Sequence, residues 1–163
     1  MADLSGKHGL VVGVANKRSI SWAIAQAAAR AGARLALTYP SARLEENVRD
    51  LAAKLDNTLV LPCDVTSDAQ IVELAAAVAR EFAGLDFLVH GAAFARQAEL
   101  DNPFIQTTRD GFHIALDVSA YSLIALSRAV RSSCSRCSSA SIMLLKACAI
   151  SDKSRGPERS ARS

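Results

Sequence analysis

The 163-residue chain is 50% hydrophobic and 21% charged, with 8 glycines and 4 prolines. This composition is typical of one globular domain and excludes a collagen-like, low-complexity or wholly disordered chain. No run approaches the roughly 18 to 20 apolar residues of a membrane span, and the N-terminal residues do not form a secretory signal, so we expect a cytoplasmic protein without membrane association. The formal charge of +3 averages two unlike parts: residues 1–127 carry 11 Lys and Arg against 14 Asp and Glu (net −3), and residues 128–163 carry 8 against 2 (net +6).

Short apolar runs alternate with amphipathic stretches through the first 130 residues. In chain order, the pattern predicts a strand at 9–14, a helix at 19–31, a strand at 34–39, a helix at 42–55, a strand at 58–62, a helix at 68–82, a strand at 86–90 and a long helix at 109–130. This alternation predicts an α/β fold with a Rossmann-like, doubly wound parallel sheet, covered by helices on both faces.

Three of these helices have a predicted apolar face. The predicted face consists of Ile20, Ala23, Ile24, Ala27 and Ala28 in the first helix, and of Ile71, Leu74, Ala75 and Val78, predicted to point inward, in the third. In the long helix, the residues that recur at helical spacing are Phe112, Leu116, Ser119, Leu123 and Leu126. Gly32 follows the first helix and is expected to end it.

The pattern ends near residue 131. Ten of the 32 residues from 132 to 163 are serine, and no aromatic residue follows Tyr121. Because such a segment has little apolar surface to bury, we expect a basic Ser/Arg/Cys-rich tail at 131–163, disordered apart from a segment able to form a short strand at 141–145. The predicted organisation is a dinucleotide-binding domain at 1–130 followed by this tail, with the sheet truncated after its fourth or fifth strand.

The loop after the first strand holds the first candidate binding residues. Gly13 and Ala15 are small enough to let a diphosphate approach the backbone, and the next helix presents unpaired N–H groups and the positive end of its dipole. Ser19 can cap that helix or bind a phosphate. The spacing departs from G-x-G-x-x-G, so this loop alone fits a plain strand-to-helix connection equally well.

Two further strand ends strengthen the nucleotide interpretation. Asp64 follows the third strand, where its carboxylate can accept a hydrogen bond from an adenine amino group while Val65 lies along the base. Small residues follow His90, and Gly91 there leaves room for a nicotinamide ribose. The plain alternatives are an aspartate that caps the third helix and a small-residue turn. Because ligands of such sheets bind at the carboxyl ends of the strands, the three loops together favour a dinucleotide.

Several short motifs occur together: GVAN at 13–16 with RSI at 18–20, LTY at 37–39, CDVT at 63–66, LDF at 85–87 with VH at 89–90, and SAYSL at 119–123. With these motifs, residues 6 to about 130 resemble the enoyl-acyl carrier protein reductases of bacterial fatty acid synthesis, a divergent branch of the short-chain dehydrogenase/reductases. The resemblance implies NADH held by Gly13, Ala15, Ser19, Ile20, Asp64, Val65 and Gly91, with Phe94 near the substrate opening. It also implies hydride transfer to the β-carbon of a trans-2-enoyl thioester carried by acyl carrier protein.

Two departures from the family pattern matter. Pro40 stands where the family usually has Gln beside the adenosine ribose, and residues 33–40 contain no Asp or Glu for its 2′-hydroxyl, so Arg18 and Arg43 leave NADPH as an alternative to NADH. The family also places a catalytic Tyr and a Lys about two helical turns apart, whereas no tyrosine follows Tyr121 here. We therefore predict no catalytic residue in this chain. The alternative is a shortened reductase that uses Tyr121 with Arg128, whose guanidinium can acidify a phenol.

The abrupt change after Val130 suggests a reading-frame shift or a truncated gene model. Our prediction is a reductase by descent that is inactive alone, with a non-catalytic NAD(H)-binding or dimerising module as the alternative. In the family the 109–130 helix is expected to pack between subunits, which favours a homo-oligomer.

Cys134-x2-Cys137 is half of a zinc pattern at most, and the three histidines lack ligand spacing, so no metal is expected. The basic tail lacks aromatic stacking groups, and we expect no nucleic acid partner.

Overall fold

A computed structural model describes residues 3–82, 84–133 and 141–144 of the chain. The strands are β1 (His8–Val12), β2 (Arg34–Tyr39), β3 (Leu59–Pro62), β4 (Phe87–His90) and β5 (Ser141–Leu144). The helices are α1 (Ile20–Arg30), α2 (Ala42–Ala52), α3 (Asp68–Phe82), α4 (Gln97–Asp101), a 3₁₀ turn (Phe104–Gln106), α5 (Arg109–Leu116), a π-helical segment (Asp117–Tyr121) and α6 (Ser122–Ser133). All strand pairs are parallel, in the order β3-β2-β1-β4-β5, which confirms the predicted α/β fold.

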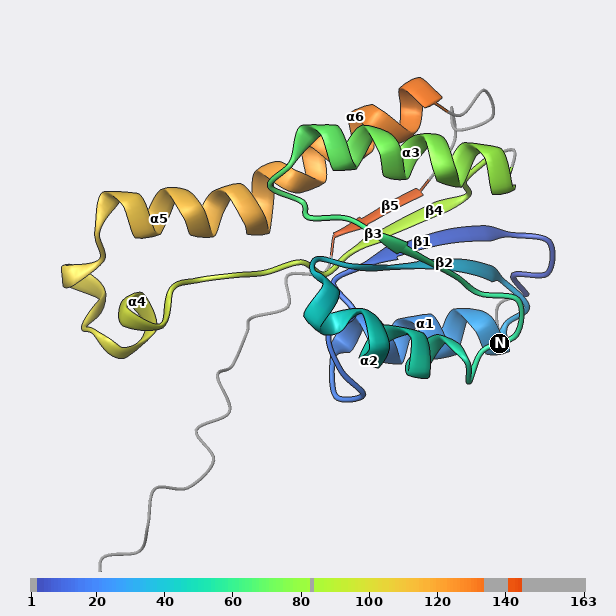
Figure 1. Cartoon of the computed structure of the whole chain (residues 1–163), viewed down its shortest axis with the longest axis horizontal. Helices are drawn as coiled ribbons and strands as arrows, with labels where there is room; N and C mark the ends of the chain where they lie inside the picture. Colours follow the sequence, from blue (N-terminus) through green and yellow to red (C-terminus); the bar gives the residue numbers. More distant parts are fainter. Residues whose placement is uncertain (1–2, 83, 134–140, 145–163) are drawn as a thin grey trace, which may run out of the picture.

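Two apolar clusters lie on opposite faces of the sheet. Figure 1 shows α1 and α2 below the sheet and α3 and α6 above it. Along β1, Leu10 and Val12 belong to the cluster with α3 and α6, whereas Val11 belongs to the cluster with α1 and α2. This alternation follows from the two-residue period of a strand, and it explains why three consecutive residues of β1, from Leu10 to Val12, are all apolar.

The face through which α1 packs differs from the prediction. The structure buries Ser21, Trp22, Ala25 and Ala28, whereas Ile20, Ala23 and Ala27 are exposed and Ile24 is half-buried. The helical period was predicted correctly and its phase was wrong. Alanine occurs all round this helix, so apolar content does not distinguish its sides; the large ring of Trp22 is the side chain that gains most from burial, and it faces the sheet.

The other helices agree with the sequence pattern to different degrees. In α3 the bounds and the inward residues Ile71, Leu74, Ala75 and Val78 are confirmed. The long helix runs from Arg109 to Ser133 with the π-helical segment inside it, and Leu126 is buried. Its residues Phe112 and Leu116 are exposed in the single chain, because α5 lies beyond the end of the sheet.

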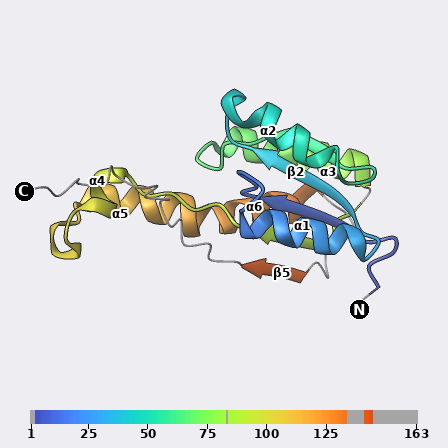
Figure 2. The same ribbon diagram turned by 90° about the horizontal axis from the view of Figure 1, so that it is seen from below.

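The segment from α4 through α5 forms an arm that extends from the carboxyl ends of the strands, as Figures 1 and 2 show. Phe104 and Ile105 at its tip are 86% and 90% exposed. Within the arm, Glu99 accepts hydrogen bonds from the Thr108 backbone N–H (3.0 Å) and hydroxyl (2.5 Å). These local contacts join α4 to the start of α5 without support from the sheet.

β5 coincides with the strand expected near 141–145 and pairs with β4. Apart from β5 and the end of α6, the predicted tail lies outside the described residues.

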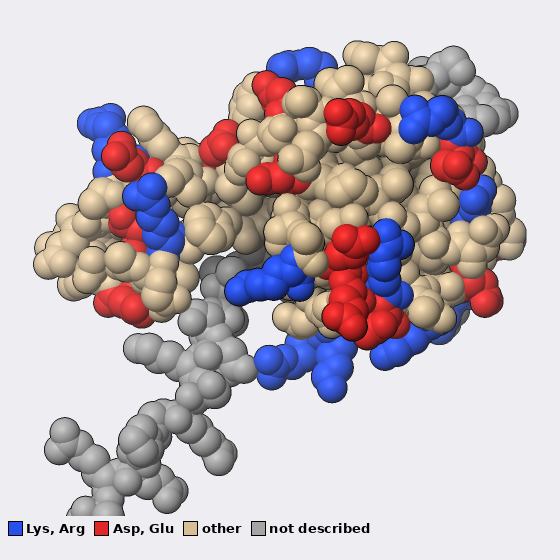
Figure 3. Space-filling view, viewed as in Figure 1, with Lys and Arg blue, Asp and Glu red and all other residues tan. Residues whose placement is uncertain are grey.

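Figure 3 shows acidic and basic side chains side by side over α2, where Arg49 pairs with Glu45 at 2.7 Å. None of the helices in the described residues is both long and apolar enough to cross a membrane.

Candidate nucleotide-binding site

The strand order reverses between β1 and β4, because the chain proceeds from β1 to β2 and β3 on one side and returns to β4 on the other. In open parallel sheets, a ligand binds outside the carboxyl ends of the strands at such a point. The loops after β1 and β4 begin at Gly13 and Gly91 respectively, so the structure brings these two predicted binding residues together.

These two loops are in direct backbone contact. Gly13 has a positive φ of 92°, and a Cβ atom added there would overlap the backbone of Gly91 and Ala92. A Cβ atom on Gly91 would overlap the buried hydroxyl of Ser21 at the start of α1. The two glycines are therefore required by the packing of the loops against each other and against α1, whether or not a ligand is bound.

The loop from Ala15 to Arg18 is exposed and is shaped by Asn16. The Asn16 side-chain oxygen accepts from the Arg18 N–H at 2.8 Å, and its carbonyl accepts from the Ser19 hydroxyl at 2.8 Å. Ser19 in turn accepts from the Trp22 N–H at 3.2 Å and caps α1. Of the two roles open to Ser19, the structure therefore shows the cap, while Ile20 lies exposed beside it.

The loop after β3 is organised around Asp64. One carboxylate oxygen accepts from both the N–H and the hydroxyl of Thr66, at 2.9 and 2.8 Å, and the Asp64 N–H donates to Gln70 at 2.8 Å. The residue at the N-terminus of α3 is Ser67, whose hydroxyl accepts from the Gln70 N–H at 3.4 Å, so Asp64 does not cap this helix. Asp64 and Val65 are half-buried at the same edge of the sheet as Gly13.

The loop after β4 is tied to the long helix by two hydrogen bonds. The backbone N–H of Phe94 donates to the Ser119 hydroxyl at 3.2 Å, and His90 Nε2 lies 2.7 Å from the Ser122 hydroxyl. Because that hydroxyl also donates to the Val118 carbonyl at 2.7 Å, it accepts from His90, which places a proton on Nε2. Phe94 itself is 50% exposed at the mouth of the loop.

The sequence reasoning did not single out His90 and Ser122, which are both fully buried. Burial lowers the pKa of His90 below its ordinary value of 6.5. A histidine that ends an apolar strand, together with serines three residues apart on an amphipathic helix, is the signal that could have indicated this contact.

The Cys63 thiol lies beside this site but is protected. Burial, with a smaller contribution from the charge of Asp64, raises its pKa to about 11. A thiol with so high a pKa is not a nucleophile near neutral pH. The described residues contain no group of three His, Cys, Asp or Glu side chains that could hold a metal ion.

Comparison with known proteins identifies the fold's relatives. A family model described as enoyl-(acyl carrier protein) reductase matches residues 13–155. The chain belongs to this family. The enoyl-acyl-carrier-protein reductase (NADH) FabI of Bacillus subtilis is 45% identical over 131 residues, which cover 79% of this chain and 51% of that protein.

Solved structures of enoyl-acyl carrier protein reductases agree. The enzyme from Aquifex aeolicus matches with a TM-score of 0.81 and 41% identity, covering 86% of this chain and 56% of that one. The Bacillus cereus reductase with NADP+ and indole naphthyridinone matches with a TM-score of 0.78 and 43% identity, covering 82% and 53%. The chain thus spans about half the length of the family members that it matches.

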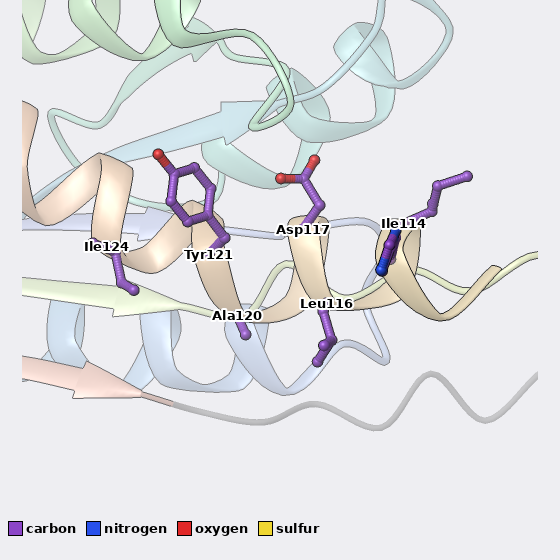
Figure 4. Close-up of a pocket in the computed structure, with 7 residues that line it drawn as sticks. Ile114, Leu116, Asp117, Ala120, Tyr121 and Ile124 are labelled. Atoms are coloured by element: carbon purple, nitrogen blue, oxygen red, sulfur yellow. The ribbon is translucent and has the colours of Figure 1, made fainter. Parts of the chain in front are cut away.

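In this reductase family member, a shallow apolar hollow of about 670 Å³ lies away from the glycine loops, along α5, the π-helical segment and α6. Figure 4 shows Leu116, Ala120 and Ile124 projecting from one side of this helix and Tyr121 and Asp117 from the other. None of the predicted nucleotide-binding residues lines the hollow.

We predict that Gly13→Ala destabilises the protein more than Gly6→Ala. Both positions have a positive φ, which costs an L-residue about 1–2 kcal/mol, but a Cβ at Gly6 meets nothing within 4 Å. Gly13→Ala adds an overlap with the Gly91 backbone, expected to cost about 1–3 kcal/mol more. Urea denaturation of both variants measures the difference, and equal losses would contradict the close contact of the two loops.

We also predict that the free energy of unfolding falls on acidification from about pH 7 to about pH 5, in part through His90. The pKa of His90 is lower in the folded protein than in the unfolded chain. As the pH falls through 6.5, the unfolded chain therefore binds the proton first, and this stabilises the unfolded state relative to the folded state. His90→Gln should flatten this part of the pH profile, whereas His113→Gln, at an exposed position, should not. Urea denaturation across the pH range tests this, and an unchanged slope in His90→Gln would refute it.

Proposed function

We propose that this chain carries the NAD(H)-binding part of an enoyl-acyl carrier protein reductase. The observation that supports this most directly is the contact of the Gly13 and Gly91 loops at the point where the strand order reverses. Gly13, Ala15, Ser19 and Ile20 would then receive the diphosphate side of the dinucleotide, and Gly91 the nicotinamide ribose. Asp64 and Val65 would hold the adenine, because the remaining carboxylate oxygen of Asp64 suits an amino-group donor.

The proposed cofactor is NADH, which the name of the Bacillus subtilis relative specifies. NADPH remains the competing cofactor, since the Bacillus cereus structure was solved with NADP+ and no acidic residue occurs between residues 33 and 40. Ser41, at the N-cap of α2, makes no side-chain cap bond, and Arg43 is exposed in the first turn of α2. Comparing the two cofactors is therefore part of the test.

For the reaction we propose hydride transfer from NADH to the β-carbon of an enoyl thioester on acyl carrier protein, with Phe94 beside the acyl chain. The chain itself is proposed to bind the cofactor without turnover. Residues 122–163 contain no tyrosine to pair with a lysine two helical turns away. Tyr121, the alternative, lines the hollow along α5 and α6 and not the glycine loops.

Titration of the purified protein with NADH and with NADPH, followed by fluorescence, tests the binding proposal. We expect saturable binding of NADH, and no NADH oxidation when crotonyl-CoA is added. Turnover that Tyr121→Phe abolishes would establish the Tyr121 alternative in place of our proposal. A failure of the wild-type protein to bind either cofactor would contradict the nucleotide site.

A second proposed role is self-association, supported by the exposed apolar row along α5 and α6. Leu116 and Ile124 are about half exposed, and with the exposed Ala120 they lie on consecutive helical turns and project from the same side of the helix (Figure 4). An exposed apolar row of this kind, which none of the described elements covers, is typical of an interface. A dimerising module would use it whether or not the chain is catalytic.

For this role we predict that the protein sediments as a dimer at micromolar concentration and that Ile124→Glu makes it monomeric, because a charge cannot be buried unpaired at an apolar interface. Val72→Glu is the matched control: Val72 is 59% exposed on α3, against 54% for Ile124, and lies outside the row. Analytical ultracentrifugation distinguishes the outcomes. A monomeric wild-type protein, or dissociation by Val72→Glu alone, would refute this interface.

A further inference from the structure

One side chain from α2 reaches the loop proposed to bind the diphosphate. Asn47, six residues into α2, donates a hydrogen bond from Nδ2 to the carbonyl oxygen of Ala15 at 2.5 Å. The hydrogen bonds that Arg18 and Ser19 donate to Asn16 are local in sequence. For residues 14–17, within the described part of the chain, the Asn47 bond is the one side-chain hydrogen bond to a helix or strand. It therefore fixes the loop relative to α2.

This bond also sets the direction of a backbone donor. The Ala15 carbonyl and the Asn16 N–H belong to one planar trans peptide, in which the two groups point in opposite directions. When Asn47 holds the carbonyl toward α2, the Asn16 N–H points away from α2. Among the described residues, the N–H groups of Ala15, Asn16 and Lys17 find no hydrogen-bond acceptor. The loop thus presents backbone donors, and Asn47 sets the orientation of one of them, the Asn16 N–H.

The same bond turns a partially negative group, the Ala15 carbonyl oxygen, away from the proposed diphosphate site. A carbonyl oxygen carries partial negative charge and would repel an anionic diphosphate if the peptide turned the other way. Asn47 engages this oxygen from the side of α2, which leaves N–H groups for the anion. An aspartate at this position could not do so, because a carboxylate has no proton to donate near neutral pH.

We propose that Asn47 is a positioning residue for the dinucleotide diphosphate, acting through the Ala15–Asn16 peptide. This rests on the proposed NAD(H) site and assigns it a determinant outside the strand-end loops. Because Asn47 is exposed and alanine favours a helix, Asn47→Ala is expected to fold normally.

The test compares ligands with and without a diphosphate. Wild type, Asn47→Ala, Asn47→Asp and the control Asn102→Ala, at an exposed position on the arm, are titrated with NADH, and ADP and adenosine are measured by ligand-observed NMR. We expect Asn47→Ala to raise the dissociation constants of NADH and ADP by about three- to tenfold, the effect of one hydrogen bond, and Asn47→Asp to raise them at least as much. Adenosine affinity and the midpoint of thermal unfolding should not change, and Asn102→Ala should match wild type.

Equal binding of NADH by wild type and Asn47→Ala would overturn the role of Asn47 and leave the nucleotide site intact. An equal loss for adenosine and ADP would also overturn it, because the effect would not then pass through the diphosphate. If wild type binds no NADH, the proposed function fails and the role of Asn47 fails with it.

Discussion

The contact between the Gly13 and Gly91 backbones is the constraint on which the rest of the site depends. It allows the loops after β1 and β4 to lie against each other, and with Ser21 it brings the start of α1 to the same point. A side chain at Gly13 would push the two loops apart, and a side chain at Gly91 would press on Ser21 at the start of α1. The small residues therefore serve the protein's own packing first, and the room that they leave for a ligand is a consequence of that packing.

Sequence periodicity predicted the elements well where one side of an element is clearly more apolar. The bounds of β2 and α3 agree with the structure. The inward face of α3 also agrees, because Ile71, Leu74 and Val78 are large and the opposite face, apart from Val72, is polar or small. Periodicity gave the wrong phase for α1, where alanines surround the helix, and in α5 it marks an apolar face that meets no part of the sheet. A repeat of apolar residues indicates a face to be covered but does not identify what covers it.

The candidate site likewise contains residues that the sequence indicates and contacts that it does not. The strand-end residues Gly13, Asp64 and Gly91 could be selected from sequence because parallel topology places strand ends at one edge. The contacts of Asn47 with Ala15 and of His90 with Ser122 join residues 32 positions apart, and no pattern within a single element reveals such a pairing. Ser119 and Ser122, on either side of the end of the π-helical segment, both bond to the chain leaving β4, so this irregular turn couples the long helix to the loop that would hold the nicotinamide.

The pairing of β1 with β4 has a consequence for the order in which the protein folds. Gly9 lies opposite Phe87, and Asp86 accepts hydrogen bonds from the Lys7 side chain and the His8 N–H, so the central pair joins segments nearly 80 residues apart in the chain. The pairing of β1 with β2 closes a much shorter loop, and chain entropy favours the shorter closure. On these grounds β1 and β2 associate with α1 before β4 arrives, and the two glycine loops meet only when the central strand gains its second neighbour.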